Sequence, residues 1–223
     1  MIPFRKIWQW LKPCLRTFWV EFIVRPFSLL GQPLNGFYEL QRYNLGLVKV
    51  ATFYLILEST LVILQFRYTG FLFNQFNVAE FNYIREVLLN AAPYLLFIAA
   101  NWSITTLMDG KGKLKDIYNV VGYALFMKVL LSLVAILLSN VLTENEAFIY
   151  WGLQTVGYGI MLIMVFFGTM VVHEYTLTKT VFTMLFTVVS ALVMMFVGLL
   201  GFSLLQQIYV FLVTIYREIV LRL

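Results

Sequence analysis

Residues 117–141, IYNVVGYALFMKVLLSLVAILLSNV, form a run of 25 residues with a single charged side chain, Lys128. About 20 predominantly apolar residues are enough for a helix to cross the ~30 Å hydrocarbon core of a bilayer. The run contains no proline that would break a helix. It is therefore predicted to span a membrane.

Similar runs recur through most of the chain, and composition gives them the same meaning. Hydrophobic residues make up 61% of the 223 residues and charged residues 12%, whereas a soluble domain usually carries about 25% charged residues. So few charges cannot cover a globule in water. The chain is predicted to be an all-α membrane protein, a bundle of about five transmembrane helices. The expected spans are 46–66, 84–108, 117–141, 148–172 and 179–205.

The sequence on either side of the five spans has a different character. Residues 1–30 are basic, aromatic and interrupted by three prolines, which predicts a segment lying on the membrane surface. Residues 31–45, with Pro33 and the Asn35-Gly36 pair, are predicted to be a turn and connector. Residues 206–223 are predicted to be an amphipathic helix in the interface, or a continuation of the fifth helix beyond the bilayer. The expected domains are thus 1–45, 46–205 and 206–223.

Lysine and arginine are distributed unequally between the two ends of these spans. Eleven fall on the side of the N-terminus and four on the other side, with Lys128 inside a span. Cytoplasmic loops carry the excess of Lys and Arg. The N-terminus is therefore expected in the cytoplasm and the C-terminus outside. The acidic loop at 143–146 then falls on the outer side.

The turn between the second and third spans reads Asp109-Gly110-Lys111-Gly112-Lys113. It lacks the G-x-x-x-x-G-K-[ST] spacing of a phosphate loop and joins two membrane helices rather than a strand and a helix. A tight basic turn at the cytoplasmic face is the preferred interpretation. Binding of an anionic lipid headgroup is its functional alternative.

The usual signatures of catalysis and of metal binding are missing from the sequence. His173-Glu174 begins like a zinc-protease motif, but Leu177 stands where the second histidine is required. Cys14 is the one cysteine, and no serine occupies a G-x-S-x-G elbow. We therefore expect no catalytic, cofactor or metal site. Because the basic residues flank apolar runs, nucleic acid is not an expected partner either.

Two charged residues, Glu58 and Lys128, fall well inside predicted spans at similar depth. A charge in hydrocarbon is costly and usually faces the bundle interior with a partner. A structural ion pair is the first interpretation, and a place in a proton or ion pathway is the second.

Three stretches together resemble the bacterial branch of the Yip-domain membrane proteins. They are Pro33-Leu34-Asn35-Gly36-Phe37-Tyr38-Glu39-Leu40 before the first span, the segment from Asn101-Trp102 to Asp116 with the following Gly122-Tyr123-Ala124-Leu125, and the closing Gln206-Gln207 with Ile215-Tyr216-Arg217-Glu218-Ile219. The motif residues of the middle segment are Asn101, Trp102, Asp109, Gly110, Lys111, Gly112, Asp116, Gly122 and Tyr123. The chain departs from the family where a proline often follows Gly-Tyr-Ala-Leu, since Phe126, Met127 and Lys128 stand there.

The resemblance implies a five-helix Yip fold and a location in a bacterial plasma membrane. Eukaryotic members act in vesicle traffic through Rab GTPases and through oligomers, while bacterial members often belong to transport-related gene clusters. The expected function is a non-catalytic scaffold or accessory subunit of a membrane transport complex, such as a solute importer. A small transporter or channel is the alternative, and an intramembrane enzyme comes third. The expected partners are membrane lipids and other integral membrane proteins, or further copies of the chain.

Overall fold

The computed structural model describes residues 19–77 and 80–222, and every regular element within those ranges is a helix. Five of the helices are long and apolar enough to cross a membrane, as the composition predicts. The basic N-terminal stretch predicted to lie on the membrane surface falls, over residues 1–18, outside the described residues. The described elements are η1 (Val20–Val24), α2 (Arg25–Gly31), α3 (Pro33–Arg42), α4 (Val48–Tyr68), α5 (Tyr83–Leu107), α6 (Leu114–Leu138), η2 (Glu144–Glu146), α7 (Ala147–Val172) and α8 (Leu177–Arg222).

The first four spans begin and end within a few residues of their predicted bounds. Local capping groups fix the start of two of them. The Asn82 side chain accepts hydrogen bonds from the Ile84 and Arg85 backbone amides and so starts α5. The Glu146 carboxylate accepts from both the backbone amide and the hydroxyl of Thr143, which fixes the start of η2 and the entry to α7.

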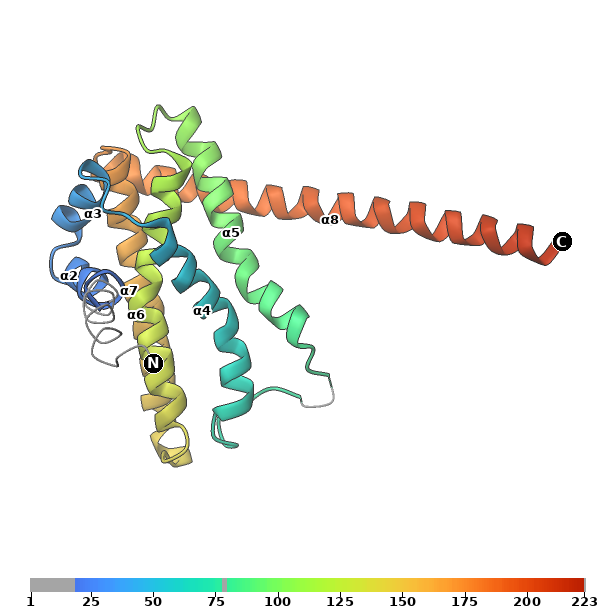
Figure 1. Ribbon diagram of the computed structural model, residues 1–223, viewed down its shortest axis with the longest axis horizontal. Coiled ribbons are helices and arrows are strands. Elements are labelled where there is room, and N and C mark those ends of the chain that lie inside the picture. The colour runs from blue at the N-terminus through green and yellow to red at the C-terminus, as the bar shows by residue number, and fades with distance from the viewer. Residues whose placement is uncertain (1–18, 78–79, 223) are drawn as a thin grey trace, which may run out of the picture.

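Helix α6 is the centre of the bundle. It packs along α7 on one side and α4 on another, and it also contacts α5. Figure 1 shows these helices side by side, with α2 and α3 covering one flank. Most of α6 is buried, including Val121, Tyr123 and Leu125. The helix predicted most directly from its apolar run is therefore the one against which α4, α5 and α7 pack.

The connector predicted for residues 31–45 is wrong in its main part, because Pro33–Arg42 form the helix α3. Pro33 stands in the first turn, where its missing amide hydrogen costs nothing. Phe37 and Leu40 then fall on one face and are buried, and α3 packs against α7. The Asn35-Gly36 pair lies inside the helix rather than in a turn. Tertiary burial has overridden a local turn signal.

The C-terminal segment is not a separate helix. Helix α8 runs without a break from Leu177 to Arg222, so residues 206–222 continue the fifth span, as the second of the two interpretations has it. In Figure 1 this helix leaves the bundle and ends as a free arm at the C-terminus. The continuity has a simple cause, since residues 177–222 contain no proline to interrupt them.

Candidate intramembrane polar site

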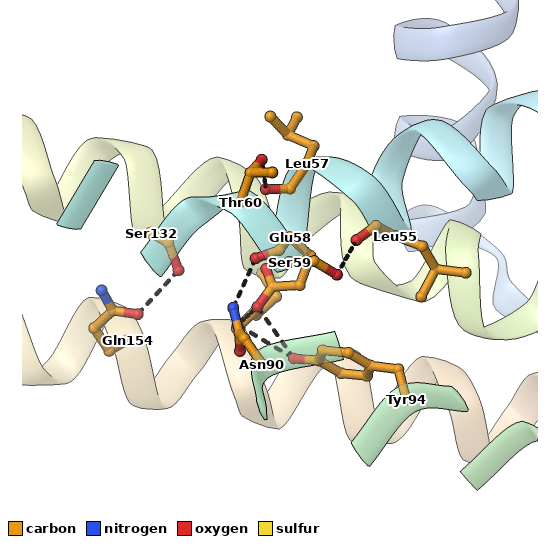
Figure 2. Close-up of polar contacts among 10 residues, drawn as sticks. Leu55, Leu57, Glu58, Ser59, Thr60, Asn90, Tyr94, Ser132 and Gln154 are labelled. Carbon is orange, nitrogen blue, oxygen red and sulfur yellow. Dashed lines mark hydrogen bonds and ion pairs between the residues drawn. The ribbon is translucent and has the colours of Figure 1, made fainter. Parts of the chain in front are cut away.

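Lys128 of α6 and Glu58 of α4 meet inside the bundle. Lys128 Nζ forms an ion pair with Glu58 Oε1, and the two side chains are 5% and 0% exposed. The structure thus brings together the two intramembrane charges that the sequence singles out. Figure 2 shows the Glu58 side chain among polar groups of the neighbouring helices.

Helix α5 completes the surroundings of the ion pair. The Tyr94 hydroxyl donates to Glu58 Oε1 at 3.1 Å and accepts from Lys128 Nζ at 3.3 Å. The Asn90 side-chain amide donates to the Glu58 backbone carbonyl at 2.8 Å (Figure 2). Glu58 Oε2 is buried and has no hydrogen-bond partner among the described residues. The carboxylate is therefore satisfied on one oxygen only.

Helix α7 supplies a second polar layer next to the pair. The Tyr158 ring lies 4.5 Å from Lys128 Nζ, a distance that suits a cation–π contact. One turn along α6 from Lys128, the Ser132 hydroxyl donates to Gln154 Oε1 at 2.9 Å. Gln154 Nε2 is buried and makes no hydrogen bond within the described part of the chain.

Gln154 and Tyr158 also line a cavity of about 400 Å³ between α4, α7 and the segment that follows α4. The ion pair thus lies directly behind one wall of this cavity. The lining residues are Gln65, Thr69, Phe73, Asn74, Gln75, Phe76, Tyr150, Trp151, Gln154 and Tyr158.

The segment 69–77 that closes the cavity is held in place by specific contacts. The Asn74 side chain donates to the Phe66 carbonyl at 2.9 Å and accepts from the Phe76 amide at 3.1 Å. The Gly70 amide donates to Ser139 Oγ at 2.9 Å, and the Phe73 ring stacks on Tyr150 at 5.1 Å. The wall is therefore part of the fold and not a loosely attached loop.

The motif residues at the end of α5 join that helix to α8. Asn101 is fully buried, and its Nδ2 donates to the Thr187 hydroxyl of α8 at 3.1 Å. Thr180, Thr183 and Thr187 recur at helical spacing and are fully buried against α5. Trp102 is 46% exposed and takes no part in this contact.

The basic turn packs on the end of α7 through its glycines. Asp109 has a positive φ of 54°, and the Gly110 amide donates to the Thr105 carbonyl at 2.8 Å, which ends α5. The Gly112 amide donates to His173 Nδ1 at 3.2 Å, while Lys111 pairs with Glu174 at 2.5 Å on the surface. A Cβ at Gly112 would come within 2.8 Å of the His173 ring.

The single histidine of the chain, His173, lies between α7 and α8 and contacts the basic turn. Burial lowers the pKa of His173 to about 4, partly opposed by the Asp116 carboxylate. His173 stacks on Tyr175 at 5.3 Å between ring centroids, and its Nε2 has no partner among the described residues. The ring is neutral at pH 7 and works as an acceptor that fixes the turn.

The remaining motif residues hold the start of α4 and of α6. Asp116 Oδ2 accepts from the Lys113 amide at 3.0 Å and caps α6. Gly122 lies directly on the backbone of Ala51, so it permits the close approach of α4 and α6. The Tyr123 hydroxyl accepts from the Leu47 amide at 3.3 Å, just before α4 begins. All of these roles are structural.

Sequence reasoning missed the partners of the ion pair and the cavity. Asn90, Tyr94, Gln154 and Tyr158 are neutral polar residues inside apolar spans, which is a signal that the sequence does carry. Their convergence from two further helices becomes visible only in the fold. Within the described residues no group of three His, Cys, Asp or Glu side chains could hold a metal ion.

A comparison of the chain with known protein families, with curated proteins and with solved structures finds no match. The resemblance to Yip-domain proteins therefore stays a prediction.

Proposed function

We propose that the chain is a non-catalytic scaffold or accessory subunit of a membrane transport complex, such as a solute importer, in a bacterial plasma membrane. The N-terminus would lie in the cytoplasm and the C-terminus outside. The observation that carries the proposal is the free arm of α8.

Helix α8 is far longer than the bundle needs. Its 46 residues give a length of about 69 Å, more than twice the ~30 Å hydrocarbon core. Only its first turns pack on the protein, through Thr180, Thr183 and Thr187. None of the described residues from Val188 to Leu221 is buried. The arm therefore offers a long surface to other membrane components.

One face of the arm is polar, which lipid alone does not satisfy. Ser203, Gln206, Gln207 and Thr214, called here the polar stripe, line a shallow groove and are all exposed. Hydroxyl and amide side chains on membrane helices hydrogen-bond across to neighbouring helices. A partner helix with polar groups on its facing side would satisfy the stripe.

The test is affinity purification in mild detergent followed by mass spectrometry. We expect a stoichiometric membrane partner to copurify with the wild type and to be lost from the double variant Gln206→Leu/Gln207→Leu. Gln75→Leu, a change at an exposed glutamine of the bundle, is the matched control and should retain the partner. Copurification of the chain with itself alone, or a partner that the double variant retains, would contradict the accessory role.

A small transporter is the second candidate, favoured by the ion pair that lies behind a polar-lined cavity. If the pair is part of a proton pathway, liposomes that contain the protein and a pH-sensitive dye should acidify faster under an imposed membrane potential than empty liposomes. Lys128→Met should abolish the difference. A scaffold predicts that protein-containing and empty liposomes acidify at the same rate.

A further inference from the structure

The cavity between α4 and α7 is built from side chains of two kinds. Four carboxamides and three hydroxyls supply hydrogen-bonding groups, and five aromatic rings, including those of Tyr150 and Tyr158, supply flat apolar faces. Its volume of about 400 Å³ lies within the roughly 300–1,000 Å³ of small-molecule sites. It shares no residue with the polar stripe of α8.

Two polar atoms of the lining are buried without a partner among the described residues, Thr69 Oγ1 and Gln154 Nε2. Thr69 is 8% exposed. Leaving a buried donor or acceptor unpaired costs about 1–3 kcal/mol. Both atoms belong to residues of the cavity wall but are covered by the protein. The half-exposed Gln65 and the exposed Gln75 are the carboxamides of the lining that a ligand can reach.

The charge of the lining restricts the ligand further. Among the described lining residues there is no Asp, Glu, Lys or Arg. The two buried charges behind the wall, Lys128 and Glu58, neutralise each other. An anionic or cationic ligand would lose its hydration without gaining a counter-ion. The ligand should therefore be neutral.

The arrangement of rings and amides selects one class of neutral ligand. A carboxamide offers donors and an acceptor side by side, which suits the neighbouring hydroxyls of a sugar. The face of an aromatic ring carries partial negative charge, which attracts the C–H groups on one face of a pyranose. Trp151 and Tyr158 provide such rings next to Gln154. We propose that this cavity binds a neutral hexose, either free or as the headgroup of a glycolipid.

The binding experiment uses the full chain in phosphatidylcholine nanodiscs and has two arms. In the first, titration calorimetry measures binding of glucose and galactose at millimolar concentration. In the second, native mass spectrometry compares nanodiscs that contain monoglucosyl diacylglycerol with nanodiscs that contain diacylglycerol. Saturable binding in the first arm indicates a free sugar. Binding confined to the glucosyl lipid indicates a lipid headgroup, and either result supports the proposal.

Two variants connect binding to the cavity. Gln65→Leu and Gln75→Leu each remove an accessible carboxamide of the cavity wall, and neither residue is buried, so folding should be little affected. We expect each change to weaken sugar binding about five- to tenfold, the loss of one hydrogen bond. Gln207→Leu on α8 should leave binding unchanged.

Three results would overturn the proposal. The first is an absence of saturable sugar binding together with equal retention of diacylglycerol and its glucosyl form. The others are tighter binding of glucose 6-phosphate than of glucose, and unchanged affinity in both Gln65→Leu and Gln75→Leu. None of them bears on the partner of α8, because the cavity and the arm are tested by different changes.

Discussion

Lys128 Nζ pairs with Glu58 Oε1, and the same Tyr94 hydroxyl bonds to both partners, while Glu58 Oε2 is left without one. The pair therefore joins α4, α5 and α6 at one point inside the bundle. Its energetic role follows from the cost of burying charge. Each ion loses its hydration. The other ion, the Tyr94 hydroxyl and, for Lys128, the Tyr158 ring compensate for that loss.

Single changes at the pair should be far more damaging than the double change. Glu58→Gln or Lys128→Met alone leaves a buried charge uncompensated, which typically costs ~3–5 kcal/mol. The double variant removes both desolvation penalties and should recover much of the loss. Thermal unfolding in detergent, followed by circular dichroism, measures the three variants. Strictly additive losses would show that the two residues do not stabilise each other.

The surface pair Lys111–Glu174 is the matched control for this cycle. Its side chains are 67% and 63% exposed, and exposed ion pairs contribute at most about 1 kcal/mol. Lys111→Met and Glu174→Gln should therefore change the melting temperature little, either singly or together.

The buried histidine predicts a loss of stability in mild acid. The pKa of His173 falls to about 4 in the fold because of burial, from 6.5 in the unfolded chain. Between these values the unfolded state binds the extra proton, so stability rises with pH and is lost as the pH falls from 6.5 towards 4. His173→Asn keeps an acceptor for the Gly112 amide but does not titrate. Its melting temperature should fall less than that of the wild type over this window, and parallel curves would contradict the assignment.

Opposite ends of α6 should be accessible from opposite sides of the membrane. Lys113 and Asn145 are both exposed, one just before α6 and the other in η2 after it. In a Cys14→Ala background, Lys113→Cys should react with an impermeant maleimide only after the cell is opened. Asn145→Cys should react in intact cells, because the excess of Lys and Arg places the N-terminal side in the cytoplasm. Labelling of both from one side would contradict α6 as a span.

The sequence predicts the spans well because a long apolar run has few stable alternatives in water or in lipid. It fails at α3, where Asn35-Gly36 signals a turn but burial of Phe37 and Leu40 stabilises a helix. The polar site shows the same difference between what a local sequence pattern reveals and what only the packing of helices decides. Charges inside spans reveal Glu58 and Lys128 directly, since each is costly there. The cavity depends on how α4, α7 and segment 69–77 meet, which no local pattern encodes.

Gly122 should be the most sensitive of the helical glycines to a small substitution. Its neighbour across the α4–α6 contact is the backbone of Ala51, which cannot turn aside as a flexible side chain would. Gly122→Ala forces the two helices apart, and overpacking of this kind typically costs 1–3 kcal/mol, about the effect expected here. Gly152 of α7 is the matched control, because a Cβ there would meet nothing within 4 Å. Gly152→Ala should be neutral or stabilising by up to ~1 kcal/mol, since alanine favours a helix over glycine. Thermal unfolding of the two variants side by side separates close packing from helix propensity. Equal melting temperatures would mean that α4 and α6 can separate without loss, and that Gly122 is not needed for their contact.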